Sequence, residues 1–135
     1  MTERTIPDFN IDQIARSGQC FRFRPLGEGH YALVAGGRYI EISQQGQTVR
    51  FDCPEDEFET VWRPYFDLDA DYGRCKRAVA KRDKYLQSAI ATGGGLRILR
   101  QELWEVIVCF IISQQNNIPR IMKCVENMCS LFGET

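Results

Sequence analysis

Residues 19–53 alternate between apolar and polar positions, with glycine-containing breaks between the runs. A period of two residues is typical of strands that bury one face and expose the other. Glycine at the breaks allows the positive backbone angles that tight hairpins need. We therefore expect an antiparallel meander with one face covered by helices. The predicted strands are Cys20–Arg24, His30–Val34, Tyr39–Ile42 and Thr48–Phe51.

From Pro54 onward the apolar positions repeat every three or four residues, which is the period of a helix. Acidic residues follow Pro54 directly, where the dipole of a helix favours negative charge. The apolar face of this helix consists of Phe58, Val61, Trp62 and Tyr65. Two further helices are predicted over Asp69–Arg77 and Asp83–Ala91. The glycine run at 93–95 indicates a joint between sub-domains.

The segment Leu103–Ile112 is apolar at every position except Glu105. A helix that is hydrophobic all round is expected to be buried on every side. One more helix follows, from Ile118 to Phe132, and it cannot cover the central helix alone. We therefore expect the chain to be the first part of a larger protein. Exposed flanks of the central helix would then favour self-association.

The composition is that of an ordinary soluble globular protein, with 44% hydrophobic and 26% charged residues over 135 positions. No apolar stretch is long enough to cross a bilayer, and the polar N-terminus is unlike a signal peptide. We therefore expect a cytoplasmic protein with no membrane partner. The six cysteines lack the close pairing of a zinc site. We interpret them as reduced thiols in the core, with no metal bound.

The net charge of −1 argues against a strongly basic nucleic-acid binder, but the charge is unevenly distributed. Residues 52–71 contain eight acidic residues and one arginine, whereas residues 72–123 contain ten basic and three acidic residues. A local basic surface is therefore compatible with the nearly neutral total. The alternative is that both runs are solvated helix faces without a partner.

Four consecutive amide residues, Gln114–Asn117, separate the apolar helix from the next one. Asn117 is suited to cap that next helix, because its side chain can accept from backbone N–H groups that have no helical partner. Amides also match base edges, and Arg120, one turn further, matches guanine, cytosine or phosphate. On the pattern alone, the segment is either a capped turn or a finger that enters a DNA duplex.

Gly18 also has two interpretations, as a turn glycine or as a position where a ligand approaches the backbone. It belongs to the first of four segments that occur in a fixed order: SGQCFRF at 17–23, YFDLD at 65–69, GLRILRQ at 95–101 and FIISQQNNIPRI at 110–121. Together these segments resemble the motifs of 8-oxoguanine DNA glycosylases of the helix-hairpin-helix superfamily. The resemblance covers nearly the whole chain.

The resemblance implies an α+β fold in two parts. Residues 1–94 would form an N-terminal antiparallel β-sheet domain of the TATA-binding-protein-like kind, with helices. Residues 95–135 would be the first helices of an incomplete all-α glycosylase domain, truncated before the helix-hairpin-helix.

The resemblance also implies roles for individual residues. The backbone carbonyl of Gly18 matches the acceptor for the N7–H group that 8-oxoguanine has and guanine lacks. Arg120 matches the arginine that holds the orphaned cytosine, and Asn116 and Asn117 match two asparagines of the family's triplet. Gln115 replaces the first asparagine, which contacts that cytosine and helps to fill the gap. It keeps the amide and adds one methylene.

The implied function is base-excision repair of double-stranded DNA that contains 8-oxoguanine opposite cytosine. The family's catalytic lysine and aspartate have no match here, because the four lysines lie outside any such motif. We therefore expect DNA glycosylase and AP lyase activity of the whole protein, with this chain alone inactive and no cofactor required. The resemblance further implies a bacterial, nucleoid-associated protein.

Two alternatives to this function remain. The first is a non-catalytic DNA- or protein-binding module derived from the glycosylase N-terminal half. The second is a related glycosylase for alkylated bases, a class that shares the fold but lacks the Gly18 and asparagine motifs.

Overall fold

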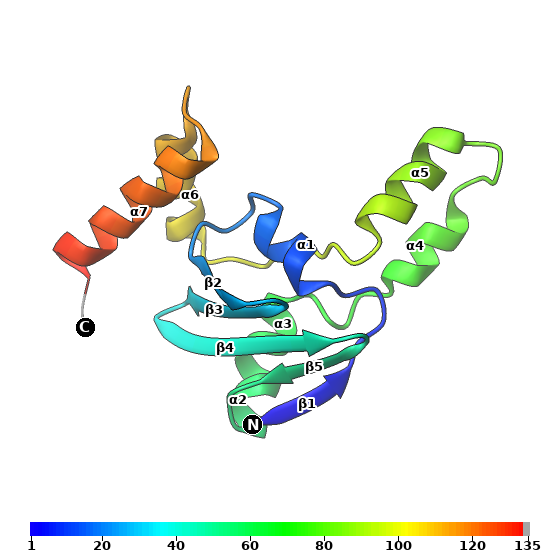
Figure 1. Ribbon diagram of the computed structural model, residues 1–135, viewed down its shortest axis with the longest axis horizontal. Coiled ribbons are helices and arrows are strands. Elements are labelled where there is room, and N and C mark those ends of the chain that lie inside the picture. The colour runs from blue at the N-terminus through cyan, green and yellow to red at the C-terminus, as the bar shows by residue number, and fades with distance from the viewer. Residues whose placement is uncertain (134–135) are drawn as a thin grey trace.

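The computed structural model describes residues 1–133 and contains a five-stranded antiparallel sheet flanked by helices, as Figure 1 shows. The strands lie in the order β1-β5-β4-β3-β2. Their bounds are β1 (Thr2–Thr5), β2 (Phe23–Gly27), β3 (His30–Ala35), β4 (Arg38–Gln45) and β5 (Thr48–Phe51). The α+β class is confirmed, and so is the meander from β2 to β5, in which each strand pairs with the next along the chain.

The start of the sheet differs from the predicted pattern. β2 begins at Phe23 rather than at Cys20, and Gln19, just before the predicted strand, bonds to the later segment 97–101. β2 forms one edge of the sheet, and its register with β3 shifts between Pro25 and Gly27. β1, which was not predicted, forms the other edge beside β5.

The core lies between the sheet and two sets of helices. α1 (Ile11–Arg16) was not predicted, and its N-cap Asn10 accepts from the backbone of Gln13 at 3.0 Å. The helix predicted from Pro54 is present as three consecutive parts. These are α2 (Glu55–Glu57), the π-helical turn η1 (Phe58–Trp62) and α3 (Arg63–Tyr65). Its apolar side chains join one buried cluster with α1 and the inner face of the sheet, which confirms the predicted amphipathic face.

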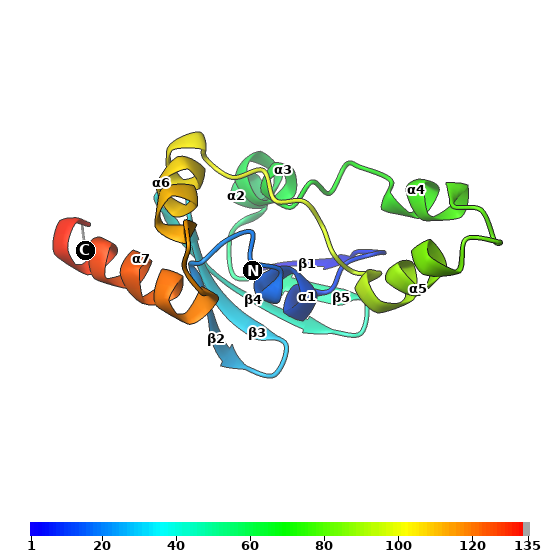
Figure 2. The same ribbon diagram turned by 90° about the horizontal axis from the view of Figure 1, so that it is seen from above.

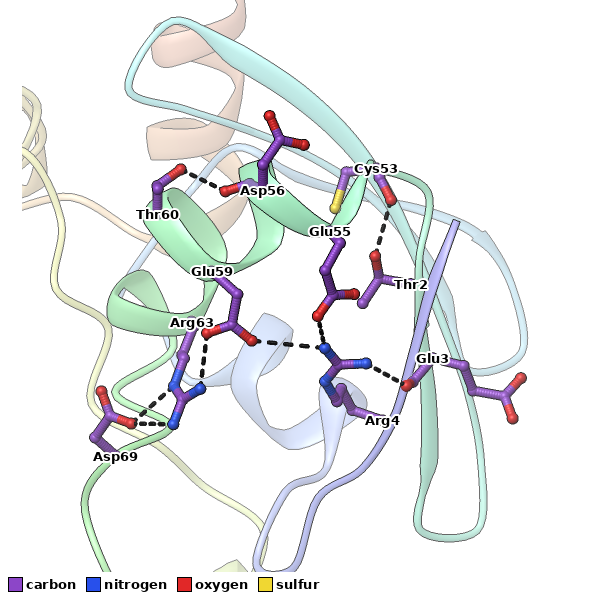
Figure 3. A network of polar contacts seen from close by, with 10 residues as sticks. All are labelled: Thr2, Glu3, Arg4, Cys53, Glu55, Asp56, Glu59, Thr60, Arg63 and Asp69. Atoms are coloured by element: carbon purple, nitrogen blue, oxygen red, sulfur yellow. Dashed lines mark hydrogen bonds and ion pairs between the residues drawn. The ribbon is translucent and has the colours of Figure 1, made fainter.

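The edge strand β1 is joined to this helical run by ion pairs, which Figure 3 shows. Arg4 pairs with Glu55 and lies 3.5 Å from Glu59. Arg63 contacts both Glu59 and Asp69 at 2.7 Å. Exposed pairs of this kind each contribute little to stability, but a network holds its members in one arrangement. The network therefore orients β1 against the helices.

Two short helices form a hairpin that projects away from the sheet (Figures 1 and 2). They are α4 (Tyr72–Ala78) and α5 (Lys84–Gly93). Asp71 caps α4 by accepting from the backbone of Arg74 at 2.8 Å, so α4 begins three residues later than predicted. Asp83 caps α5 in the same way. Both predicted helices are therefore present, with shifted ends.

Residues 95–101 return from the hairpin into the core. The carbonyl of Gly95 accepts from the backbone of Asn10 at 2.8 Å, and Gly95 is buried. Arg97 is only 3% exposed, and Leu99 belongs to the buried cluster. These contacts tie the segment to the sheet unit. The division of the chain at residue 94 stays a prediction.

The last two helices form a second hairpin, α6 (Leu103–Ser113) and α7 (Ile118–Phe132), at the opposite end of the molecule (Figure 2). The expected exposed flanks of the apolar helix are present, because none of its residues is buried within residues 1–133 and Trp104 and Phe110 are 69% and 65% exposed. Complete burial of such a helix needs neighbours on all sides. Within residues 1–133, α7 is the one helix that packs along it. Self-association through this apolar surface stays a prediction.

All six cysteines are free thiols, but they do not share one environment. Cys20 and Cys53 are buried, as expected for core thiols. Cys75, Cys124 and Cys129 are exposed, so their assignment to the core is wrong. They lie on α4 and α7, which leave most of their surfaces uncovered within the described chain. As for membranes, the helices of residues 1–133 are all too short or too polar to span one.

Candidate nucleic-acid interface

Gly18 lies in the loop between α1 and β2, which runs towards α6 and α7 in Figures 1 and 2. Its backbone is left-handed, with φ of +77°, and a Cβ atom added there would have no heavy atom within 4 Å. The space beside Gly18 is therefore open, but a side chain would strain the backbone. Gly18 lines a cleft of about 350 Å³ that Ile118 and Met122 of α7 border on the other side.

The Gly18 loop is held in place by the segment 95–101. The side chain of Gln19 donates to the carbonyl of Arg97 at 2.9 Å and accepts from the backbone N–H of Leu99 at 3.0 Å. The side chain of Gln101 donates to the carbonyl of Gln19 at 2.6 Å. Two of the four motif segments thus bind each other directly. Sequence reasoning identified both segments but not their contact, because a single sequence carries no signal for this pairing.

The amide turn between α6 and α7 uses much of its own hydrogen-bonding capacity. The side chain of Asn116 donates to the carbonyl of Ile112 at 3.0 Å, and that of Asn117 accepts from the backbone of Arg120 at 3.1 Å. The predicted N-cap at Asn117 is confirmed. Gln115 is exposed and left-handed, with φ of +49°. Its side-chain amide forms no hydrogen bond among those found within residues 1–133.

The structure places the predicted site residues in two neighbouring groups. Gly18 and the first two turns of α7 share the cleft, whereas Gln115, Asn116 and Asn117 form the turn that leads into α7. Arg120 lies on the first turn of α7 and is exposed. No carboxylate of the described chain pairs with it. The amide turn and Arg120 do not line the Gly18 cleft themselves, and they adjoin it along the chain through Ile118 and Met122 of α7.

An ion pair links the loop side of the site to α6. Arg22, four residues after Gly18, lies 3.6 Å from Glu105, and the two side chains are 27% and 18% exposed. Burial raises the pKa of Glu105, and the nearby charge of Arg22 partly offsets that rise. Sequence reasoning noted Glu105 as the one interruption of an apolar helix but assigned it no role. A lone acid in such a helix is a signal for a buried charge partner.

Replacing Glu105 with glutamine should reduce the dependence of stability on pH. Because the pKa of Glu105 is raised in the folded chain, folding favours its protonated form. Its contribution is fully present below the ordinary glutamate pKa of about 4.3 and is lost as the pH rises through the folded value. Urea unfolding at a series of pH values from about 4 to 7 should show a smaller fall in stability for Glu105→Gln than for the unchanged chain.

Glu28, an exposed glutamate in the turn between β2 and β3, provides the control. The Glu28→Gln variant should keep the pH dependence of the unchanged chain. If Glu105→Gln and Glu28→Gln behave alike, the partial burial of Glu105 does not control this dependence.

Several solved structures share this arrangement over nearly the entire chain. MBOgg1 in complex with a low-affinity DNA ligand superposes with a TM-score of 0.92 at 42% identity, covering 99% of this chain and 47% of that one. The 8-oxoguanine glycosylase/lyase of Clostridium acetobutylicum, bound to double-stranded DNA with cytosine opposite 8-oxoguanine, gives 0.88 at 38% identity, covering 94% and 44%. An N-glycosylase/DNA lyase of Saccharomyces cerevisiae is 51% identical over 84 residues, 61% of this chain and 22% of that protein.

The fold is therefore that of one part of the 8-oxoguanine DNA glycosylases. The sequence model of the 8-oxoguanine DNA glycosylase N-terminal domain matches residues 2–107, which is most of the chain. The chain belongs to this 8-oxoguanine DNA glycosylase family. It spans less than half the length of the relatives and solved proteins named above.

Proposed function

We propose that this chain supplies the lesion-recognition and orphan-base contacts of a base-excision 8-oxoguanine DNA glycosylase with AP lyase activity. One observation carries the proposal. The open backbone at Gly18 and the first turns of α7 border the same cleft, and α7 begins at the amide turn that precedes Arg120. A flipped base and the gap that it leaves in the duplex would thus be contacted from adjacent surfaces.

The carbonyl of Gly18 supplies the discrimination between damaged and normal guanine. 8-Oxoguanine carries a proton on N7, whereas guanine has an acceptor there, so one carbonyl attracts the first and repels the second. The absence of a side chain at Gly18 leaves room for the base to approach. The bonds from Gln19 to residues 95–101 fix this loop before DNA arrives, which limits the entropy lost on binding.

Arg120 and Gln115 act on the opposite strand. Arg120 has no ion-pair partner within residues 1–133, and its guanidinium matches the acceptors of the orphaned cytosine. The amides of Asn116 and Asn117 are engaged in shaping the turn. Gln115 has a left-handed backbone at the same turn. We assign to its side-chain amide the role of filling the space that the flipped base leaves in the duplex. The two asparagines then act by holding Gln115 and Arg120 in place.

Bond cleavage requires a nucleophile that this cleft does not contain. Among the described residues that line the Gly18 cleft there is no lysine. We therefore assign the lysine that attacks the sugar to a part of the whole protein outside residues 1–133. The glycosylase and lyase steps are proposed for that whole protein, and recognition for this chain.

Arg120→Ala should weaken binding to a duplex that contains 8-oxoguanine opposite cytosine by roughly 10- to 100-fold, since a bidentate base contact is worth about 1–3 kcal/mol. Binding to 8-oxoguanine opposite adenine should change much less. Fluorescence anisotropy with the two duplexes measures both affinities. Lys123→Ala, one turn further along α7 and paired with Glu126 within residues 1–133, is the matched control and should change either affinity less than about threefold.

The same measurement contains the result that would contradict the proposal. The unchanged chain should bind the 8-oxoguanine·cytosine duplex more tightly than an otherwise identical guanine·cytosine duplex. Equal affinities for these two duplexes would remove the assigned role of Gly18.

A further inference from the structure

The α4–α5 hairpin carries a concentrated positive charge that the recognition site does not use. Residues 72–93 contain six basic residues and one acidic residue, although the whole chain has a net charge of −1. In Figure 1 the hairpin and the α6–α7 turn both rise on the same side of the sheet. Figures 1 and 2 agree that the two hairpins lie at opposite ends of the molecule, with α1 between them.

The base of this hairpin is anchored to the sheet unit. Lys76 pairs with Asp8, in the loop that follows β1. The hydroxyl of Tyr72 donates to Asp67 at 3.0 Å, and its ring lies 4.5 Å from the guanidinium carbon of the buried Arg97. These contacts give the hairpin a fixed direction relative to the rest of the fold.

Four other basic residues of the hairpin, one near its base and three at its tip, have no such partners. Arg74, Lys81, Arg82 and Lys84 are all exposed. No carboxylate of residues 1–133 lies within ion-pairing distance of any of them. The single acid at the tip, Asp83, is occupied in capping α5. The hairpin therefore presents unneutralised cations on an anchored support, which is the electrostatic pattern of a polyanion-binding surface.

We propose that the α4–α5 hairpin binds the phosphate backbone of the DNA duplex that flanks the lesion, as a second contact separate from the Gly18 cleft. The choice of DNA as partner rests on the proposed function. A duplex that crosses the α6–α7 turn can extend over α1 towards the other end of the molecule, and it carries one negative charge per about 1.7 Å. Tyr85, 90% exposed beside Lys84, is available to contact the same backbone.

An anionic membrane is the less favoured partner for this surface. Membrane-surface helices combine basic residues with a continuous apolar face. α4 and α5 have seven and ten residues, and the large apolar side chains they expose are Tyr85 and Leu86. Leu86 also borders the groove between α5 and Ile98, so it is partly committed to the fold.

The test compares two variants that remove the same charge from different places. Lys81→Gln/Arg82→Gln changes the tip of the hairpin, and Arg38→Gln/Arg50→Gln changes exposed arginines of the sheet. The affinity of the 135-residue chain for an undamaged duplex of about 25 base pairs is measured from about 50 to 300 mM salt. Each phosphate contact contributes about 0.9 to the slope of log K against log salt concentration. For the hairpin variant, the magnitude of that slope should fall by the equivalent of about two phosphate contacts. Its affinity at 0.1 M salt should be lower by roughly tenfold or more.

The sheet variant should keep the slope of the unchanged chain. Equal slopes for the hairpin variant and the unchanged chain would overturn the proposal, and so would equal losses in both variants. Binding of the hairpin to phosphatidylserine-containing vesicles, with no effect of the variant on DNA, would assign the surface to membranes instead.

Failure of this proposal can be told apart from failure of the proposed function. The hairpin contacts phosphates that are the same in damaged and normal DNA. The hairpin variant should therefore keep the ratio of affinities for 8-oxoguanine and guanine duplexes. Loss of that ratio in the unchanged chain would count against the Gly18 role, whatever the salt slope shows.

Discussion

Replacing Arg97 with alanine is expected to lower the free energy of unfolding by about 3–5 kcal/mol, because several backbone carbonyls lose hydrogen bonds to a charged donor, each worth about 1.5–3 kcal/mol. Arg97 is 3% exposed, and its guanidinium donates to the carbonyls of Pro7, Asp8, Asp67 and Ala70 at 2.8–3.3 Å. Burial lowers the pKa of Arg97, but arginine remains charged at ordinary pH. The four carbonyls therefore stabilise its positive charge in place of water. Alanine would remove the charged donor from all four half-buried contacts.

The same motif contains the control for this experiment. Arg100 lies three residues later, with a side chain that is 69% exposed and pairs with Asp67 at 2.8 Å. Arg100→Ala should cost less than about 1 kcal/mol, as an exposed ion pair does. Urea unfolding of both variants measures the difference. Similar losses for the two arginines would show that the carbonyl cluster does not depend on Arg97.

Replacing Gly95 with alanine is expected to have the second largest effect, a loss of about 3 kcal/mol or more, because extra atoms in a packed region cannot be absorbed there. A Cβ atom on Gly95 would lie 2.2 Å from the Cβ of Asn10 and 2.7 Å from its backbone nitrogen. Relief requires the backbone of Asn10 to move, which breaks its 2.8 Å bond to Gly95 and disturbs the N-cap of α1.

Gly93 provides a control within the same glycine run. It ends α5, and a Cβ atom there would have no heavy atom within 4 Å. Gly93→Ala should therefore change stability by less than about 1 kcal/mol, in the stabilising direction, because alanine restricts the unfolded chain. Thermal unfolding of the two variants should separate them clearly. A Gly95→Ala variant as stable as Gly93→Ala would mean that α1 does not pack against this segment as described.

The sequence predicted correctly those elements in which apolar residues recur with the period of a strand or a helix. The alternating strands β3 to β5 and the face made by Phe58, Trp62 and Tyr65 follow this rule. α1 was missed because it has only six residues, although Asn10 and the spacing of Ile11 and Ile14 carry its signal. β1 was missed because four residues without strong alternation give no period to detect.

Properties that depend on distant segments could not be predicted. The apolar run of α6 does form a helix, but its burial depends on what packs around it. At the candidate site, the residue types at Gly18 and in the amide turn left two interpretations open, and the resemblance of the four motif segments gave them roles in DNA binding. The bonds from Gln19 to residues 95–101 and the pair between Arg22 and Glu105 could not be read from spacing. They join positions that are about 80 residues apart.

The irregular β2 edge has a consequence for how copies of this chain can meet. Pro25 offers no N–H group to a neighbouring strand, and the register shift beside it interrupts the regular row of donors and acceptors. Such an edge resists extension by a strand from another molecule, a common first step of β-aggregation. Association of concentrated samples through the β2 edge is therefore disfavoured compared with association through the exposed apolar side chains of α6 and α7.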